Sequence, residues 1–240
     1  MADDFPVAIL AGGMGTRLRP LTEHIPKGLV EVAGRPFLEH QLALLKRNGL
    51  DRVVLCVGYL GHKVCEYFGD GSRFGMHVRY SHDGPSLLGT AGSVRKALPL
   101  LGDEFFALYG DSYLPCDYRA VADAFRRSGQ RGLMTVFRNE GRHDTSNVEF
   151  VDGCIRRYDK QNRTPAMRHI DYGLGVFRRS VFAALDRDQP RDLARVYQEL
   201  LEAGELAAFE VSQRFYEVGS LEGLRETAGY LSALEGGAKS

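Results

Sequence analysis

The sequence predicts an α/β fold in which a mixed, mostly parallel central sheet is flanked by helices. Short apolar runs alternate with helical patterns in the first half, which is typical of parallel strands joined by crossover helices. Three of these runs, at 5–10, 52–59 and 76–81, predict the first strands. Near residue 150 two short runs are separated by Asp152-Gly153, which predicts an added antiparallel hairpin.

The remaining elements are read from apolar spacing and from the residues that end each run. We expect helices over 37–48, 62–68 and 118–127, one opening at 88–92, two between 178 and about 203, and one after 220. Thr90 is the expected N-cap of the helix at 88–92, which would turn backbone N–H groups towards a ligand. Further strands are expected over 104–110, 133–138 and 168–178, the last broken by Gly173 and Gly175.

Composition excludes several classes of function. The chain has 240 residues and is 44% hydrophobic, which suits one domain spanning 1–240. Lys+Arg and Asp+Glu both number 31, and a nucleic-acid binder would normally carry a basic excess. The four cysteines show no metal-ligand spacing. Signal-peptide and membrane-spanning patterns are absent, so we expect a cytoplasmic protein without nucleic-acid or membrane partners; the sequence leaves homo-oligomerisation open.

The segment after the first strand is suited to binding an anion. Its glycines let backbone N–H groups approach a ligand with no Cβ in the way, and a hydroxyl and cations follow. The Rossmann fingerprint is excluded because Leu18 stands where its third glycine would be, and no Gly-Lys-Ser/Thr of a P-loop is present. A polyphosphate is the expected ligand. The candidates to bind it are Leu10, Ala11, Gly12, Gly13, Gly15, Thr16, Arg17 and Lys27.

The run LAGGMGTRLRPLT…PK resembles the N-terminal signature of the sugar-1-phosphate nucleotidylyltransferases, and the resemblance extends from Phe5 to about Leu234. It implies a Rossmann-like, GT-A-type nucleotidyltransferase fold. It also implies an Mg²⁺-dependent enzyme that converts a nucleoside triphosphate and a sugar 1-phosphate into a nucleotide sugar and pyrophosphate. In that family the glycines and arginine hold the triphosphate and the lysine contacts phosphate, which makes Arg17 and Lys27 the catalytic candidates.

The resemblance assigns the other site residues. The LGTAG segment at 88–92 matches the family's nucleobase loop, so Gly89 and Thr90 are expected there, with Asp83 and Ser86 nearby. The acidic-Lys pair after the hairpin predicts that Lys160 binds the acceptor phosphate, and the glycine-containing strand predicts that Asp171 and Gly173 touch the sugar.

Two carboxylates are expected to bind the metal. Gly110-Asp111 matches the family's metal motif, although a lone Asp after a strand is more often a turn former. Glu217 stands in EVGS where the family has Asp-x-Gly-Thr, so its carboxylate is one methylene further from the backbone. This departure leaves open whether Glu217 contacts Mg²⁺ directly or through water.

The resemblance does not single out one substrate pair. The GTAG segment resembles mannose- or heptose-1-phosphate guanylyltransferases, whereas GDGSRFG (69–75) and KALPLLGD (96–103) resemble N-acetylmuramate-1-phosphate uridylyltransferases. We favour GTP with heptose or mannose 1-phosphate. The alternatives are UTP or dTTP with N-acetylmuramate, glucose or N-acetylglucosamine 1-phosphate, a phosphocholine cytidylyltransferase, which the lack of tryptophan disfavours, and a catalytically silent nucleotide-sugar sensor.

Overall fold

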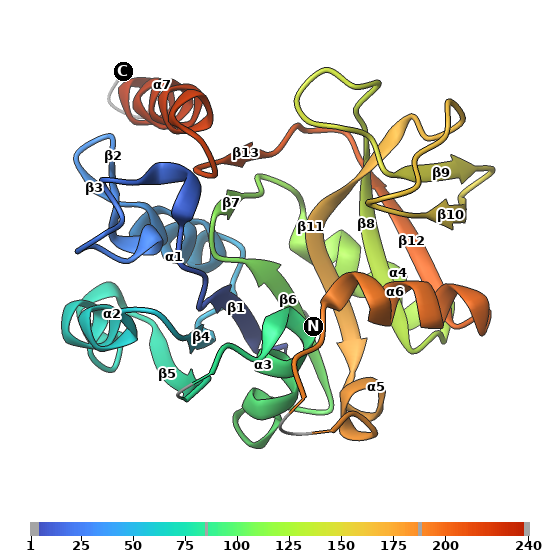
Figure 1. Ribbon diagram of the computed structural model, residues 1–240, viewed down its shortest axis with the longest axis horizontal. Coiled ribbons are helices and arrows are strands. Elements are labelled where there is room, and N and C mark those ends of the chain that lie inside the picture. Colours follow the sequence, from blue (N-terminus) through green and yellow to red (C-terminus); the bar gives the residue numbers. More distant parts are fainter. Residues whose placement is uncertain (1–4, 85, 187–188, 238–240) are drawn as a thin grey trace.

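A nine-stranded mixed sheet forms the centre of the computed structural model, which describes residues 5–84, 86–186 and 189–237 (Figure 1). Four strands are parallel in the order β6-β1-β4-β5. Their bounds are Val7–Ala11 (β1), Arg52–Val57 (β4), His77–His82 (β5) and Glu104–Tyr109 (β6). Parallel neighbours require crossover connections, which α1 (Phe37–Arg47), α2 (Gly61–Phe68) and α3 (Gly89–Ala97) provide.

The second half of the sheet is attached through the antiparallel pair β6–β11. Strand β11 (His169–Arg178) pairs with β8 (Gly132–Arg138) on one side; on the other side it pairs with β9 (Val148–Val151) at His169 and with β6 further along. The outer strands are β10 (Cys154–Tyr158), antiparallel to β9, and β12 (Leu206–Val211), parallel to β8. The expected hairpin is confirmed: Asp152 and Gly153 both have positive φ in the turn between β9 and β10.

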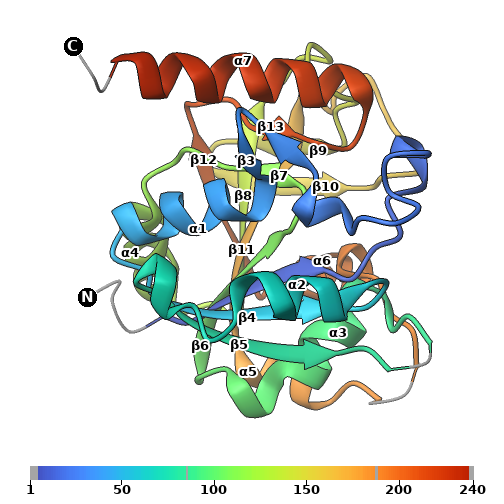
Figure 2. The same ribbon diagram turned by 90° about the vertical axis from the view of Figure 1, so that its left-hand side faces the viewer.

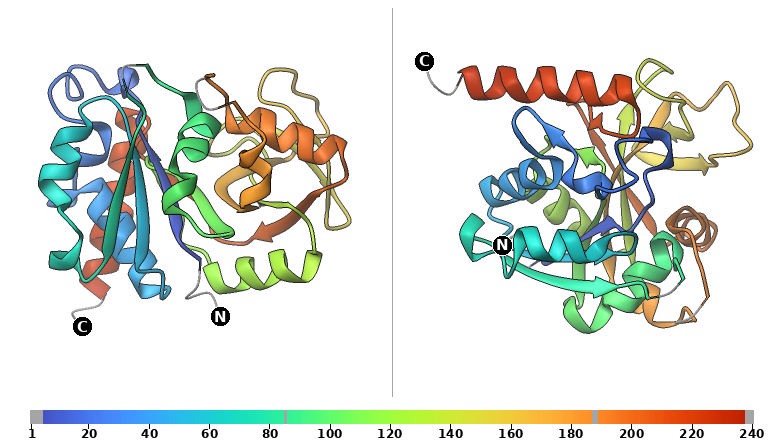
Figure 3. Two further views of the ribbon diagram at one scale, coloured as in Figure 1. Left: turned by 90° about the horizontal axis from the view of Figure 1, so that it is seen from below. Right: turned by 60° about the vertical axis from the view of Figure 1, so that its left-hand side comes forward.

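Helices cover both faces of the sheet, as the view from below in Figure 3 shows. One hydrophobic core lies beneath α1, α2, α4 (Tyr118–Ser128) and α7 (Leu221–Gly237). The other lies beneath α3, α5 (Arg179–Ala183) and α6 (Leu193–Glu202). Figure 2 shows α7 along one end of the molecule, beside the small β2–β3 ladder (Glu31–Val32, Arg35–Pro36). A second small ladder joins β7 (Ser112–Tyr113) to β13 (Tyr216–Glu217).

Most predicted elements are present within a residue or two of their expected bounds, but the structure corrects two details. Strand β11 is not broken at Gly173 and Gly175; it continues through both, and only its register with β8 shifts between Asp171 and Gly175. Strand β12 was not predicted at all. None of the helices that the structure describes combines the length and hydropathy that a membrane span requires.

Candidate active site

The site forms where the carboxyl ends of the parallel strands meet at one edge of the sheet. Residues that follow these strands approach one another closely, as in other open α/β sheets. The Gly110 N–H donates to the Leu10 carbonyl at 2.9 Å, and a Cβ on Gly110 would lie 2.8 Å from that oxygen. Glycine at this position therefore lets Asp111 follow β6 directly beside the end of β1.

A first pocket of about 260 Å³ opens along this edge. It is lined by the glycine loop and Lys27 and by the expected nucleobase loop, which lies about 60 to 80 residues further along the chain. The predicted residues that line it are Leu10, Ala11, Gly12, Gly13, Gly15, Lys27, Asp83, Gly89, Thr90 and Asp111.

The glycine loop is held by its own residues. Gly15 has φ +62°, a left-handed conformation that favours glycine, and its carbonyl accepts a hydrogen bond from the Thr22 hydroxyl at 2.8 Å. Thr16 and Arg17 are exposed and line neither this pocket nor the acceptor pocket described below. Arg17 points instead towards Glu217: its Nη2 and the Glu217 Oε1 lie 3.0 and 3.2 Å from the position that a Cβ on Gly219 would occupy.

Thr90 lies in the pocket, but its predicted N-cap role is wrong. Leu88 occupies the cap position of α3, and the Thr90 hydroxyl accepts a hydrogen bond from the Leu193 N–H at 2.7 Å, at the start of α6. The expectation that the first amides of α3 face a ligand is also wrong for Ala91 and Gly92, which donate to the Arg191 carbonyl. Gly89 remains at the pocket wall with φ +69°.

Asp83 is buried at the end of β5, with 6% of its surface exposed. Its Oδ1 accepts a hydrogen bond from the Ser93 hydroxyl at 2.7 Å. Its Oδ2 lies 3.2 Å from the position that a Cβ on Gly12 would occupy, so this oxygen is directed to the glycine loop. Ser86 is exposed and does not line the pocket.

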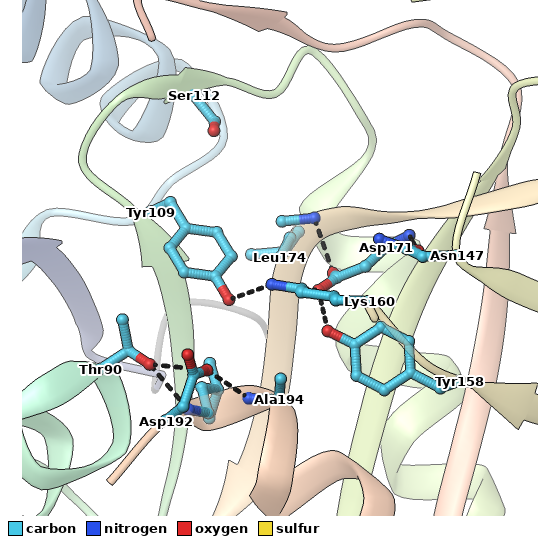
Figure 4. Close-up of polar contacts among 12 residues, drawn as sticks. Thr90, Tyr109, Ser112, Asn147, Tyr158, Lys160, Asp171, Leu174, Asp192 and Ala194 are labelled. Carbon is cyan, nitrogen blue, oxygen red and sulfur yellow. Dashed lines mark hydrogen bonds and ion pairs between the residues drawn. The ribbon is translucent and has the colours of Figure 1, made fainter. Parts of the chain in front are cut away.

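A second pocket, of about 260 Å³, adjoins the first; we call it the acceptor pocket. Three residues expected at a sugar phosphate, Lys160, Asp171 and Gly173, line it. Lys160 Nζ lies 3.9 Å from Asp171 Oδ2, and the Asp171 side chain, only 3% exposed, also accepts from the Tyr158 hydroxyl and the Gly173 N–H (Figure 4). This network holds the lysine at the pocket while 41% of its side chain stays accessible.

The two expected metal ligands face the acceptor pocket together. The Val218 N–H donates to the Asp111 carbonyl at 2.9 Å, which places Glu217 next to Asp111 across the β7–β13 ladder. Burial, with the negative charges of Asp111 and Asp144, raises the pKa of Glu217, while Arg17 and Lys27 oppose this shift. Lys27 Nζ lies 2.6 Å from Asp111 Oδ2.

This donor set fits Mg²⁺, which takes one or two carboxylates together with substrate oxygens. The fit rests on two partly buried carboxylates whose mutual repulsion a cation would relieve. Among the described residues no cluster of three or more acidic, histidine or cysteine side chains could hold a metal by itself.

Several pocket residues were not expected. Tyr109 and Ser93 line the first pocket, and Tyr109, Asp144, Asn147, Arg163 and Phe215 line the acceptor pocket. Tyr109 and Asp111 line both, so the two pockets meet at the end of β6. A Tyr at the end of a buried strand carries no sequence signal beyond core packing.

Comparison with known proteins agrees with this geometry. The profile of the nucleotidyl transferase family matches residues 7–231. The chain belongs to this family. The resemblance noted in the sequence is therefore confirmed, and the mixed sheet matches the family fold: the inositol-1-phosphate CTP transferase of T. maritima superimposes with a TM-score of 0.74 over 95% of this chain and 94% of that one, at 22% identity.

Two relatives within the nucleotidyl transferase family differ in their substrates. The chain is 30% identical over 216 residues to the mannose-1-phosphate guanylyltransferase catalytic subunit beta of Drosophila pseudoobscura pseudoobscura, covering 88% of this chain and 58% of the relative. It is 41% identical over 114 residues to the N-acetylmuramate alpha-1-phosphate uridylyltransferase of Neisseria meningitidis, covering 47% and 49%. The matches thus span about half of these relatives' lengths.

Proposed function

We propose that the protein transfers a nucleotidyl group from a nucleoside triphosphate to a sugar 1-phosphate and releases pyrophosphate. The observation that carries the proposal is the junction of two pockets at Tyr109 and Asp111. The first has the glycine loop and Lys27 for a triphosphate, and the second has Lys160 for a phosphate. An acceptor oxygen and the α-phosphorus would therefore meet at the end of β6.

The reaction depends on the positions of the two substrates and does not require a general base. A phosphate monoester with a second pKa of about 6 is largely dianionic at neutral pH, so its oxygen can attack directly. The new oxygen–phosphorus bond forms as the bond between the α-phosphorus and the bridging oxygen of pyrophosphate breaks. Lys27 would neutralise charge on the triphosphate, and Lys160 would hold the acceptor. Mg²⁺ held by Asp111 and Glu217 would supply positive charge at the α-phosphate.

Guanine is the nucleobase that Asp83 favours. A carboxylate only accepts hydrogen bonds, and guanine offers it two adjacent donors, N1–H and the amino group. Uracil and thymine offer one N–H that lies between two carbonyl oxygens. A carboxylate would repel those oxygens. Because Asp83 Oδ2 is directed to the glycine loop at the pocket wall, we infer that GTP is preferred over UTP or dTTP.

Asp83→Asn tests this inference. It keeps an acceptor for the Ser93 hydroxyl but replaces one oxygen by a donor. The ratio of kcat/KM for GTP to that for UTP should fall roughly 10- to 100-fold, as expected for loss of about 1–3 kcal/mol of base discrimination. Asp103→Asn, at a residue that lines neither pocket, is the matched control. An unchanged ratio in Asp83→Asn would show that Asp83 does not read the base.

Mannose or heptose 1-phosphate is our proposed acceptor. The guanylyltransferase relative aligns with 88% of this chain, whereas the uridylyltransferase aligns with 47%. UTP- or dTTP-dependent transfer to N-acetylmuramate, glucose or N-acetylglucosamine 1-phosphate is the alternative.

Pyrophosphate release tests the activity. The protein should release it when mixed with Mg²⁺, a triphosphate and a matching sugar 1-phosphate, most rapidly with GTP and mannose or heptose 1-phosphate. No release with any common nucleoside triphosphate and any of the five sugar 1-phosphates named above would refute the proposed activity. Binding of both ligands without turnover would then favour a nucleotide-sugar sensor, which the joint presence of Lys27, Asp111 and Lys160 in adjoining pockets disfavours.

A further inference from the structure

Tyr109 lies where the two pockets meet, and both ends of the residue are fixed. It is the last residue of β6, and its carbonyl accepts a hydrogen bond from Gln41 Nε2 at 2.9 Å. Its ring packs against β11, where Cδ2 lies 3.3 Å from the position that a Cβ on Gly173 would occupy. Gly173 has φ +94°, so the strand adopts a conformation suited to glycine where the ring passes.

The hydroxyl of Tyr109 points to Lys160. Lys160 Nζ donates to Tyr109 Oη at 3.5 Å and lies 5.4 Å from the ring centroid (Figure 4). The same ammonium lies 3.9 Å from Asp171 Oδ2. The lysine is therefore held between a carboxylate on β11 and a phenol on β6, at the border of the acceptor pocket.

The Tyr109 phenol carries its hydrogen at neutral pH, because a tyrosine hydroxyl ordinarily loses its proton only at about pH 10. Because Lys160 donates to the phenol oxygen, that contact does not use the phenol's own hydrogen. Within the described part of the chain, no hydrogen bond has the Tyr109 hydroxyl as its donor.

We propose that Tyr109 donates this hydrogen bond to the phosphate of the acceptor substrate, so that Tyr109 and Lys160 together bind it. The inference rests on the proposed function and extends it by one substrate-binding residue. A neutral donor is useful here because the pocket also holds Asp111, Asp171 and Glu217, whose charges repel a dianionic phosphate. Tyr109 neither gains nor loses a proton as the acceptor oxygen bonds to the α-phosphorus and pyrophosphate leaves.

Tyr109→Phe is the test, since it removes one oxygen and keeps the ring against Gly173. Hydrogen bonds to charged groups contribute enough that KM for the sugar 1-phosphate should rise about tenfold or more, while KM for the triphosphate changes less than about twofold. The matched control is Tyr80→Phe, because the Tyr80 hydroxyl donates to the Gly69 carbonyl outside both pockets. It should leave both KM values unchanged.

The outcomes separate this inference from the proposed function. If the wild-type protein releases pyrophosphate and Tyr109→Phe has wild-type KM values, the inference fails and the function stands. If both KM values rise equally, the hydroxyl acts only on pocket structure, and the inference also fails. If wild type releases no pyrophosphate with any substrate pair, the proposed function fails first. If Tyr109→Phe lowers the melting temperature, the two KM values are measured below the unfolding transition. Their ratio still tests the inference, because a general loss of structure would raise both KM values.

Discussion

Lys160 and Lys27 occupy different pockets although both are cations placed for phosphate. Lys160 borders the acceptor pocket beside Asp171, and Lys27 borders the first pocket beside Asp111. The two substrates should therefore depend on different lysines. A carboxylate partner limits the positions of each ammonium, which reduces the entropy lost when phosphate binds.

Lys160→Met should consequently raise KM for the sugar 1-phosphate about tenfold or more and leave KM for the triphosphate nearly unchanged. Steady-state kinetics with each substrate varied in turn measure this. Lys46→Met is a matched control, because Lys46 donates to the Phe74 carbonyl and lines neither pocket. Equal losses for both substrates would contradict the assignment of Lys160 to the acceptor.

Glu217→Gln should lower kcat at least tenfold and raise the Mg²⁺ concentration needed for half-maximal rate, because the change removes one of two carboxylates while keeping the side chain's size. Added Mg²⁺ should also stabilise the wild-type protein in thermal melts and stabilise the variant less. Glu226→Gln is the control, since Glu226 lies on α7 and pairs with Arg214, which precedes β13. If Glu217→Gln has the wild-type kcat and the full thermal shift with Mg²⁺, Glu217 does not bind the metal and Asp111 is the remaining candidate.

The candidate site residues that could be identified from the sequence are those with a recognisable pattern among their immediate neighbours in the chain. Glycines after an apolar run, and an Asp or Lys at a strand end, carry a signal in a few neighbouring positions. Tyr109 was missed because an aromatic residue ending an apolar strand looks like core, and only the β6–β11 pairing brings it to Lys160. Thr90 lines the first pocket, but its hydrogen-bond partner could not be predicted, because Leu193 lies 103 residues further along the chain.

At the scale of elements, one buried side chain holds the conformation of the loop that follows β1. Thr22 is 1% exposed, and its hydroxyl donates to the Gly15 carbonyl at 2.8 Å. The bond spans seven residues and closes the segment 15–22, which follows Gly12 and Gly13 in the chain. Tyr59 and Lys63 donate to the carbonyls of Glu23 and His24, so the residues just after Thr22 are also tied to the segment after β4.

Thr22→Val should raise KM for the triphosphate several-fold and lower stability by about 1–2 kcal/mol, because an isosteric methyl leaves the Gly15 carbonyl without its donor. Thr22→Ser keeps the hydroxyl and should retain most of the wild-type affinity. Triphosphate titrations and denaturant unfolding measure the two effects. A Val variant that binds triphosphate as tightly as the Ser variant would show that the loop keeps its shape without this bond.

Strand β12, which was not predicted, shows that a strand can depend on pairing with a distant part of the chain. Strand β12 reads LAAFEV, and its two alanines favour a helix at least as much as a strand. It becomes a strand because it pairs in parallel with β8, more than 70 residues earlier. The hairpin of β9 and β10 was predicted because its turn residues lie next to the strands that they join.

At the scale of the whole molecule, α7 links the end of the described chain to the site. The Thr227 hydroxyl donates to the Glu217 carbonyl at 3.1 Å, and the rings of Tyr216 and Tyr230 stack at 3.9 Å. Leu231 is 3% exposed within the same core as α1 and β1. The helix that positions Glu217 therefore shares its core with the first strand, as expected if residues 1–240 form one domain.

If α7 belongs to that domain, a buried and an exposed leucine on it should differ sharply in their effects. Leu231→Ala should lower the free energy of unfolding by about 2–5 kcal/mol, since it removes buried methyl groups and leaves a cavity. Leu234→Ala, at a residue that is 44% exposed, should change it by less than about 0.5 kcal/mol. Guanidinium unfolding followed by circular dichroism and tyrosine fluorescence should give one coincident transition for each variant. An earlier separate transition in Leu231→Ala, or equal effects of the two changes, would mean that α7 unfolds independently and that Glu217 is held by β7 alone.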